Sequence, residues 1–171
     1  MGMEISLIAS NTLKIKSKKT TLVIDPSLDM GKISCDGVLL LQDQTVNTSK
    51  VVDFRVVVSS VGEYEIGGIK IKAEKDKENN VWYVLRVDKV NVVLSRASVL
   101  LKIIDKLNSC DVLVLNLAGE DIQPIVSACE PKIIAVYPKS AGENIKDKIT
   151  EKKIVAYAEK LPDVVQTVVL D

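Results

Sequence analysis

Short apolar segments separated by polar turns make up the first half of the chain. Several alternate apolar and polar side chains, the pattern of a strand with one buried face. Residues 37–41 are apolar throughout, as in a strand buried on both faces. The pattern predicts strands at residues 3–8, 12–15, 21–24, 37–41, 55–59, 69–73, 81–87 and 90–94.

The second half alternates strands with helices. Ser98 can cap a helix over residues 99–107, whose apolar positions share one face, and Asp121 can cap another over residues 122–129. We expect a polar helix over residues 142–151. Apolar segments predict strands at residues 112–115, 133–137, 154–156 and 164–170.

Consecutive strands followed by alternating strands and helices favour an α/β architecture. Two sheets packed face to face with helices outside would bury every apolar face. A length of 171 residues and a hydrophobic content of 47% suit one domain spanning residues 1–171. Periodicity alone leaves other α/β arrangements open.

Composition narrows the classes of function. The 23 basic and 23 acidic residues balance, so no net field attracts nucleic acid or an anionic membrane. No apolar stretch reaches the length of a membrane span, and the N-terminus does not resemble a secretory signal. Cys35, Cys110 and Cys129 are widely spaced, which favours buried free thiols over disulfides. These features predict a cytoplasmic protein.

Histidine is absent from the sequence. It is the commonest metal ligand in proteins and the usual general base near neutral pH. Its absence excludes the Ser–His and Cys–His systems of nucleophilic catalysis.

Three stretches match the order and spacing of motifs in one known superfamily. Residues 3–15 have the pattern of a first hairpin, residues 21–26 read Thr-Leu-Val-Ile-Asp-Pro, and residues 62–69 read Gly-Glu-Tyr-Glu-Ile-Gly-Gly-Ile. Together they resemble the metallo-β-lactamase-fold superfamily, in particular its small lactonase-like metal-dependent hydrolases. The resemblance implies a four-layer αβ/βα sandwich of two mixed β-sheets with helices outside. It also implies a site at one edge, where strand-end loops converge.

The residues that would bind metal in that superfamily are missing. Its H-x-H-x-D-H motif would follow residues 37–41, where Gln42, Gln44, Val46 and Asn47 stand at the ligand positions. Amide oxygens are weak ligands for zinc, and a valine side chain is not a ligand. The chain therefore resembles a degenerate member that lacks all the ligand histidines.

Further departures support the same interpretation. Ser10 stands where the first hairpin usually has histidine, Arg96 falls near the bridging aspartate, and Pro138 falls near the final histidine. Hydrolytic zinc needs about three nitrogen, sulfur or carboxylate ligands and an open position for water. We therefore expect no metal site, no cofactor and no conventional zinc hydrolysis.

The altered positions predict a vestigial ligand-binding pocket. Arginine and amide side chains suit carboxylate or phosphate groups, so a small polar or anionic ligand is expected. The candidate residues are Ser10, Asn11, Asp25, Gln42, Asp43, Gln44, Asn47 and Arg96.

Two hypotheses assign more specific roles within that pocket. In one, Arg96 replaces the metal as the cation and pairs with Asp25 or Asp43 and with amide oxygens. Loss of its side chain would then cost on the order of 3–5 kcal/mol. In the other, Asp25, Asp43 and the Gln42 and Gln44 amides bind magnesium or calcium.

The sequence thus favours a non-catalytic metallo-β-lactamase-fold protein that serves as a binding or interaction module. Its partner is a small ligand, another protein or a second copy in a homodimer. One alternative is a lactonase-like metal-dependent hydrolase with atypical ligands or none. Another is a nucleic-acid module, which the neutral charge and the lack of an aromatic–basic stripe disfavour.

Overall fold

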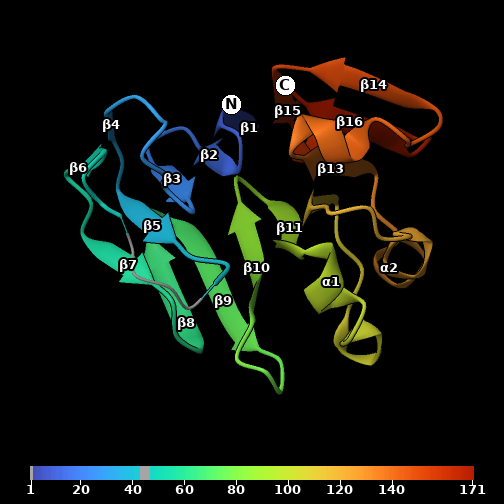
Figure 1. Cartoon of the computed structure of the whole chain (residues 1–171), viewed down its shortest axis with the longest axis horizontal. Coiled ribbons are helices and arrows are strands. Elements are labelled where there is room, and N and C mark those ends of the chain that lie inside the picture. Colours follow the sequence, from blue (N-terminus) through green and yellow to red (C-terminus); the bar gives the residue numbers. More distant parts are fainter. Residues whose placement is uncertain (1, 43–46) are drawn as a thin grey trace.

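Two β-sheets lie face to face in the computed structural model, which describes residues 2–42 and 47–171 (Figure 1). The first sheet has the strand order β15-β1-β2-β3-β5-β7. Strands β1, β2 and β3 are antiparallel neighbours, whereas β3, β5 and β7 run parallel. The bounds are β1 (Met3–Ala9), β2 (Thr12–Lys16), β3 (Thr21–Ile24), β5 (Gly37–Leu39), β7 (Val56–Val58) and β15 (Lys153–Ala156).

The second sheet has the strand order β14-β16-β13-β12-β11-β10-β9-β8. Its first four strands in the chain are antiparallel, and the later ones run parallel to their neighbours. The bounds are β8 (Gly62–Ile66), β9 (Ile69–Lys75), β10 (Val81–Val87), β11 (Val90–Arg96), β12 (Val112–Asn116), β13 (Ile133–Tyr137), β14 (Lys148–Glu151) and β16 (Gln166–Leu170).

Different elements cover the outer faces of the two sheets. Helices α1 (Ala97–Leu100) and α2 (Gln123–Cys129), with the 3-10 turns η1 (Ile104–Lys106) and η2 (Lys139–Gly142), pack on the second sheet. The first sheet is covered by β4 (Ile33–Ser34), β6 (Val51–Val52) and their loops, and η3 (Ala158–Lys160) lies near the C-terminus. In Figure 1 these layers run from β4 and β6 on the left to α1 and α2 on the right. The predicted α/β sandwich of two mixed sheets is confirmed.

Apolar side chains form three layers of core. The largest cluster fills the space between the sheets, the second lies beneath α1 and α2, and the third lies beneath β4 and β6. Each fully buried Val, Leu or Ile contributes roughly 1.5–3 kcal/mol through removal of apolar surface from water. Cys35, Cys110 and Cys129 are buried free thiols within these clusters, as the sequence predicted.

Trp82 and Tyr83 show why both faces of the second sheet are buried. They are neighbours on β10 and so point to opposite faces. Tyr83 belongs to the cluster between the sheets, and Trp82 packs beneath the helices with 4% of its surface exposed. Both aromatic side chains are therefore buried, one on each face of the sheet.

The predicted helix over residues 142–151 is also wrong. Its first part is the turn η2 and its last part is strand β14, which pairs with β16. Asp147 has a φ of 53°, which interrupts a right-handed helix. Pairing with the edge of the second sheet satisfies the backbone of a polar segment that has no apolar face to bury.

The predicted helix over residues 99–107 is shorter than expected. Helix α1 begins two residues earlier, with Arg96 rather than Ser98 as its N-cap, and ends at Leu100. Ile103 has a φ of −128°, outside the helical region, and the 3-10 turn η1 follows it. Val99, Leu100 and Ile103 are buried beneath this segment, whereas Ile104 and Leu107 are only partly buried.

Helix α2 agrees with its prediction to within one residue. It covers Gln123–Cys129, and the Asp121 carboxylate accepts a hydrogen bond from the Gln123 N–H at 3.0 Å. None of the helices within residues 2–42 and 47–171 has the length and apolar character needed to cross a bilayer. The carboxyl ends of β3, β5, β11 and β12 meet at one edge of the sandwich.

Candidate functional site

A cavity of about 540 Å³ lies at the edge where these strand ends converge. Asp25 follows β3, Gln42 follows β5, Arg96 ends β11 and Asn116 ends β12. Parallel strands place the residues at their carboxyl ends together, which explains how positions far apart in sequence meet. The described lining residues are Asn11, Asp25, Pro26, Ser27, Leu28, Leu40, Gln42, Asn47, Arg96 and Asn116.

Five of the eight residues predicted from the sequence line this cavity. They are Asn11, Asp25, Gln42, Asn47 and Arg96. Ser10 is exposed and does not belong to the described lining. Asp43 and Gln44 lie outside the described residues. Whether any of these side chains binds a ligand remains a prediction.

Two hydrogen bonds hold Asp25 in place, one to its side chain and one to its backbone. Its carboxylate Oδ1 accepts a hydrogen bond from the Leu41 N–H at 2.9 Å, and its carbonyl accepts one from the Thr12 hydroxyl at 2.7 Å. Its φ of 50° lies in the left-handed region, which aspartate and asparagine tolerate better than most residues. The turn after β3 therefore fixes this carboxylate at the cavity wall.

The environment of Asp25 makes its charge costly. Burial raises the pKa of its carboxyl from 3.8 to about 6, although the Leu41 N–H and the charge of Arg96 act in the opposite direction. Loss of hydration disfavours the charged form of a carboxyl group. Asp25 is thus ionised near neutral pH but close to titration.

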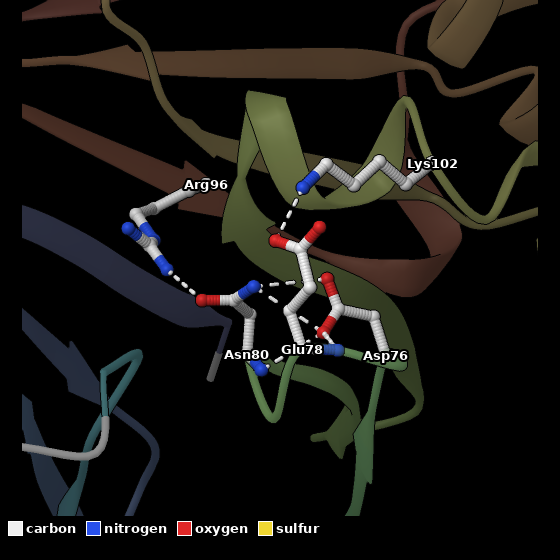
Figure 2. A network of polar contacts seen from close by, with 5 residues as sticks. All are labelled: Asp76, Glu78, Asn80, Arg96 and Lys102. Atoms are coloured by element: carbon white, nitrogen blue, oxygen red, sulfur yellow. Dashed lines mark hydrogen bonds and ion pairs between the residues drawn. The ribbon is translucent and has the colours of Figure 1, made fainter.

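Arg96 carries the second charge of the described cavity lining. Its Nη2 donates a hydrogen bond to the Asn80 side-chain oxygen at 2.7 Å (Figure 2). No ion pair joins it to Asp25, although both side chains are described. The Asn80 side chain is a partner that the sequence did not predict. The hypothetical ion pair with Asp25 does not form, and the alternative partner Asp43 lies outside the described residues.

The turn between β9 and β10 orients Asn80. The Asn80 side-chain nitrogen donates to both carboxylate oxygens of Asp76, at 3.2 and 3.0 Å, and the Glu78 backbone N–H donates to Asp76 at 2.8 Å. Burial raises the pKa of Asp76, but these hydrogen bonds together outweigh it and leave the pKa below its usual value. Glu78 also pairs with Lys102 at 2.6 Å, which ties the turn to the segment after α1 (Figure 2).

Asn116 lines the cavity, and the Tyr137 side chain is buried next to it. The Asn116 side-chain nitrogen donates to the Asn11 side-chain oxygen at 3.1 Å, so the ends of two sheets are joined across the cavity. The Tyr137 hydroxyl is fully buried beside Asn116 and completes no hydrogen bond within the described part of the chain. Its pKa is raised by burial and by the nearby charge of Asp25.

Tyr83 anchors the backbone that directly follows β5. Its hydroxyl contacts the carbonyl oxygens of Leu40 and Val58 at 2.6 and 2.9 Å and accepts a hydrogen bond from the Leu40 N–H at 3.2 Å. Leu40 lines the cavity, so a buried side chain of the second sheet holds the cavity wall built by the first.

Sequence reasoning missed Asn116 and Asn80. Asn116 directly follows the predicted strand at residues 112–115, and the rule that strand ends converge could have included it. Asn80 belongs to a turn that has no motif, and only the fold brings it to Arg96.

The fold is shared with known structures. A protein from Thermotoga maritima, described as a zinc-dependent hydrolase of the metallo-β-lactamase superfamily, aligns over 98% of both chains with a TM-score of 0.78 and 16% identity. The metallo-β-lactamase-fold protein YhfI from Bacillus subtilis aligns over 79% of this chain and 85% of its own, with a TM-score of 0.57 and 10% identity. This chain has the metallo-β-lactamase fold. At such low identity the likeness establishes the fold alone.

A third solved structure supports the same fold. A protein from Parabacteroides distasonis, described as a metal-dependent hydrolase, aligns over 83% of this chain and 89% of its own, with a TM-score of 0.54 and 14% identity. No protein-family model matches the sequence, and no curated protein sequence does.

The described residues of the cavity do not suit a hydrolytic zinc ion. Within residues 2–42 and 47–171, no three or more His, Cys, Asp or Glu side chains are grouped so that they could hold a metal. Asp25 is the only carboxylate in the described lining, and the Arg96 guanidinium adds positive charge to the same space. A zinc site of this kind needs about three such ligands.

Proposed function

We propose that this chain uses the metallo-β-lactamase fold for binding and not for catalysis. Its ligand is a small polar molecule with an acidic group, held in the cavity by the Arg96 guanidinium. The observation that carries this proposal is the Arg96–Asn80 hydrogen bond of 2.7 Å, which orients a cation beside a cavity lined by amide side chains. A guanidinium oriented in this way can bind a carboxylate or phosphate through two parallel hydrogen bonds.

The amides would set the orientation of the ligand. Asn11, Gln42, Asn47 and Asn116 offer donors and acceptors around the described lining. Each can adapt by exchanging its oxygen and nitrogen, so they suit a polar molecule better than a bare ion. Asp43, Gln44 and Ser10 remain candidate contributors from the sequence.

Hydrolysis by a metal-dependent mechanism is the alternative, because the structural relatives from Thermotoga maritima and Parabacteroides distasonis are described as hydrolases. Such an enzyme would need other metal ligands than the described cavity residues offer. Elemental analysis of the purified protein separates the two functions. We expect much less than one equivalent of zinc, manganese or iron per chain, and a full equivalent that survives dialysis would favour the hydrolase.

Binding itself can be measured with acetate as the simplest acidic probe. In ¹H–¹⁵N NMR spectra we expect acetate to shift the Arg96 side-chain signal and the amide signals of Asn11 and Asn116. Arg96→Gln should abolish these shifts because it removes the cation while keeping a polar side chain.

Arg86→Gln is the matched control. Arg86 is an exposed arginine on the neighbouring strand β10 and does not line this cavity. It should leave the acetate shifts intact. If Arg86→Gln weakened the shifts as much as Arg96→Gln did, the effect would be one of general charge, and the proposed binding function would fall.

A further inference from the structure

Asp25 and Arg96 place opposite charges in one cavity without pairing with each other. Asp25 is compensated by the Leu41 N–H at 2.9 Å, and Arg96 by the Asn80 amide oxygen at 2.7 Å. Both partners are neutral, so each charge keeps capacity for an opposite charge. A guanidinium has five N–H donors, and a carboxylate accepts several hydrogen bonds.

The charge balance of the cavity restricts its ligand. Asp25 and Arg96 are the only charged side chains in the described lining, so that lining is neutral overall. A purely anionic ligand would satisfy Arg96 but bring a like charge towards Asp25, which is unfavourable in a partly buried site. A ligand with one positive and one negative group would satisfy both.

We propose that the cavity binds a zwitterion of the amino-acid class, whose carboxylate contacts Arg96 and whose ammonium group contacts Asp25. This inference rests on the proposed binding function and names the class of ligand for the same site. The carboxylate would form two hydrogen bonds to the guanidinium, and the ammonium would donate to the second carboxylate oxygen of Asp25. The four amides would contact the rest of the molecule.

The surroundings of Asp25 support a cationic partner. The charged and titratable groups that influence it in the described structure are Arg96 from β11 and the hydroxyls of Tyr83 and Tyr137 from β10 and β13. Burial raises the pKa of both tyrosines, which keeps these hydroxyls neutral. Apart from Arg96, no described group thus brings a positive charge to a carboxylate that burial disfavours.

The cavity has room for such a molecule. Its volume of about 540 Å³ lies within the range of roughly 300–1,000 Å³ that is common for sites that bind small molecules. A series of probes that differ in the distance between their two charged groups can then identify the separation that the cavity prefers.

Titration with matched pairs of small molecules tests the inference. Each pair has the same carbon chain with and without an ammonium group: glycine and acetate, β-alanine and propionate, 4-aminobutanoate and butyrate. Dissociation constants are measured at pH 7.5 by NMR or calorimetry. At least one zwitterion should bind about tenfold more tightly than its carboxylate partner, which corresponds to about 1.4 kcal/mol.

Asp25→Asn should remove this preference and leave the carboxylates bound. The substitution keeps an oxygen that can accept the Leu41 N–H, and asparagine tolerates the left-handed φ of 50°. Asp88→Asn is the matched control, because Asp88 is exposed and also has a positive φ, 47°. It should leave the tenfold preference unchanged.

The outcomes distinguish this inference from the proposed function. If zwitterions and carboxylates bind equally and both require Arg96, the binding function stands and the zwitterion assignment is overturned. If Asp25→Asn keeps the preference, Asp25 does not contact the ammonium group and the assignment is likewise overturned. If no probe binds at millimolar concentration, the binding function and the assignment both fail.

Discussion

Asp25 illustrates, at the scale of single residues, a conflict between stability and the proposed role in binding. Its carboxylate lies at a cavity wall where burial raises its pKa to about 6. Groups with perturbed pKa values gather at functional sites, although structural networks also produce them. Burying a neutral side chain of the same shape would require less free energy. The ionised form of Asp25 therefore lowers stability, and the proposed binding function gives a reason for its presence.

That cost predicts a pH-dependent effect of Asp25→Asn on stability. Because the folded-state pKa is raised from 3.8 to about 6, the folded state binds more protons than the unfolded state between these values. The wild type therefore loses stability as the pH rises from about 4 to 6, by up to about 3 kcal/mol. Asparagine has no such dependence, so the variant should be more stable than the wild type at pH 8 and similar at pH 4.

Urea unfolding at the two pH values measures this difference. Asp88→Asn serves as the control, because no burial acts on an exposed carboxylate of the same backbone conformation. An equal effect of Asp25→Asn at pH 4 and pH 8 would mean that its carboxyl titrates normally in the folded protein.

Single residues also show what the sequence could predict of the site. Asn11, Asp25, Gln42, Asn47 and Arg96 stand at motif positions or next to them, and all five line the cavity. The partner of Arg96 could not be predicted. Whether its guanidinium reaches Asp25 or Asn80 depends on distances in the folded protein, which the sequence does not give. A family resemblance aligns positions along the chain, but it does not give the direction in which a long side chain points.

The turn between β9 and β10 is the element that orients Arg96. Asp76 fixes Asn80, and Asn80 in turn accepts from the guanidinium (Figure 2). A hydrogen bond to a charged group stabilises a fold by about 1.5–3 kcal/mol, which is less than the cost of breaking a buried ion pair. We therefore expect Arg96→Ala to cost about 1–3 kcal/mol and not the larger figure of an ion pair.

A double-mutant cycle isolates this contact. Arg96→Ala, Asn80→Ala and the double variant are unfolded in urea, and a coupling free energy of about 1–2 kcal/mol is expected between the two positions. Asn91→Ala provides the control, since Asn91 is exposed on the same strand as Arg96 and is no part of this contact. Additive effects of Arg96 and Asn80 would show that the turn does not orient the guanidinium.

Elements differ in how well the sequence predicted them. The strands of the two sheets have clear apolar patterns, and their predicted positions agree closely with β3, β10, β12 and β13. Strand β14 could not be predicted from its pattern, because its stability comes from pairing with β16. The stability of an edge strand depends on pairing with its neighbour, whereas a buried strand is recognisable from its own apolar sequence pattern.

On the scale of the whole molecule, the core explains how a metallo-β-lactamase fold can exist without the histidines. The apolar clusters extend between the sheets and beneath α1 and α2, and the cavity lies at one edge of them. Apolar burial is the dominant favourable contribution to folding. Changes at the edge therefore leave most of the stabilising contacts in place, which is compatible with a lost or altered site.

The same continuity predicts that residues 1–171 unfold as one unit. Trp82 is the only tryptophan and lies beneath the helices, whereas far-ultraviolet circular dichroism reports mainly on the two sheets. In a two-state transition both signals have the same urea midpoint. We expect coincident curves that are unchanged when EDTA is added, because the core and not a metal holds the sheets together. Separate midpoints would instead indicate that the helical face and the sheets unfold independently, and an EDTA-sensitive midpoint would indicate a structural metal.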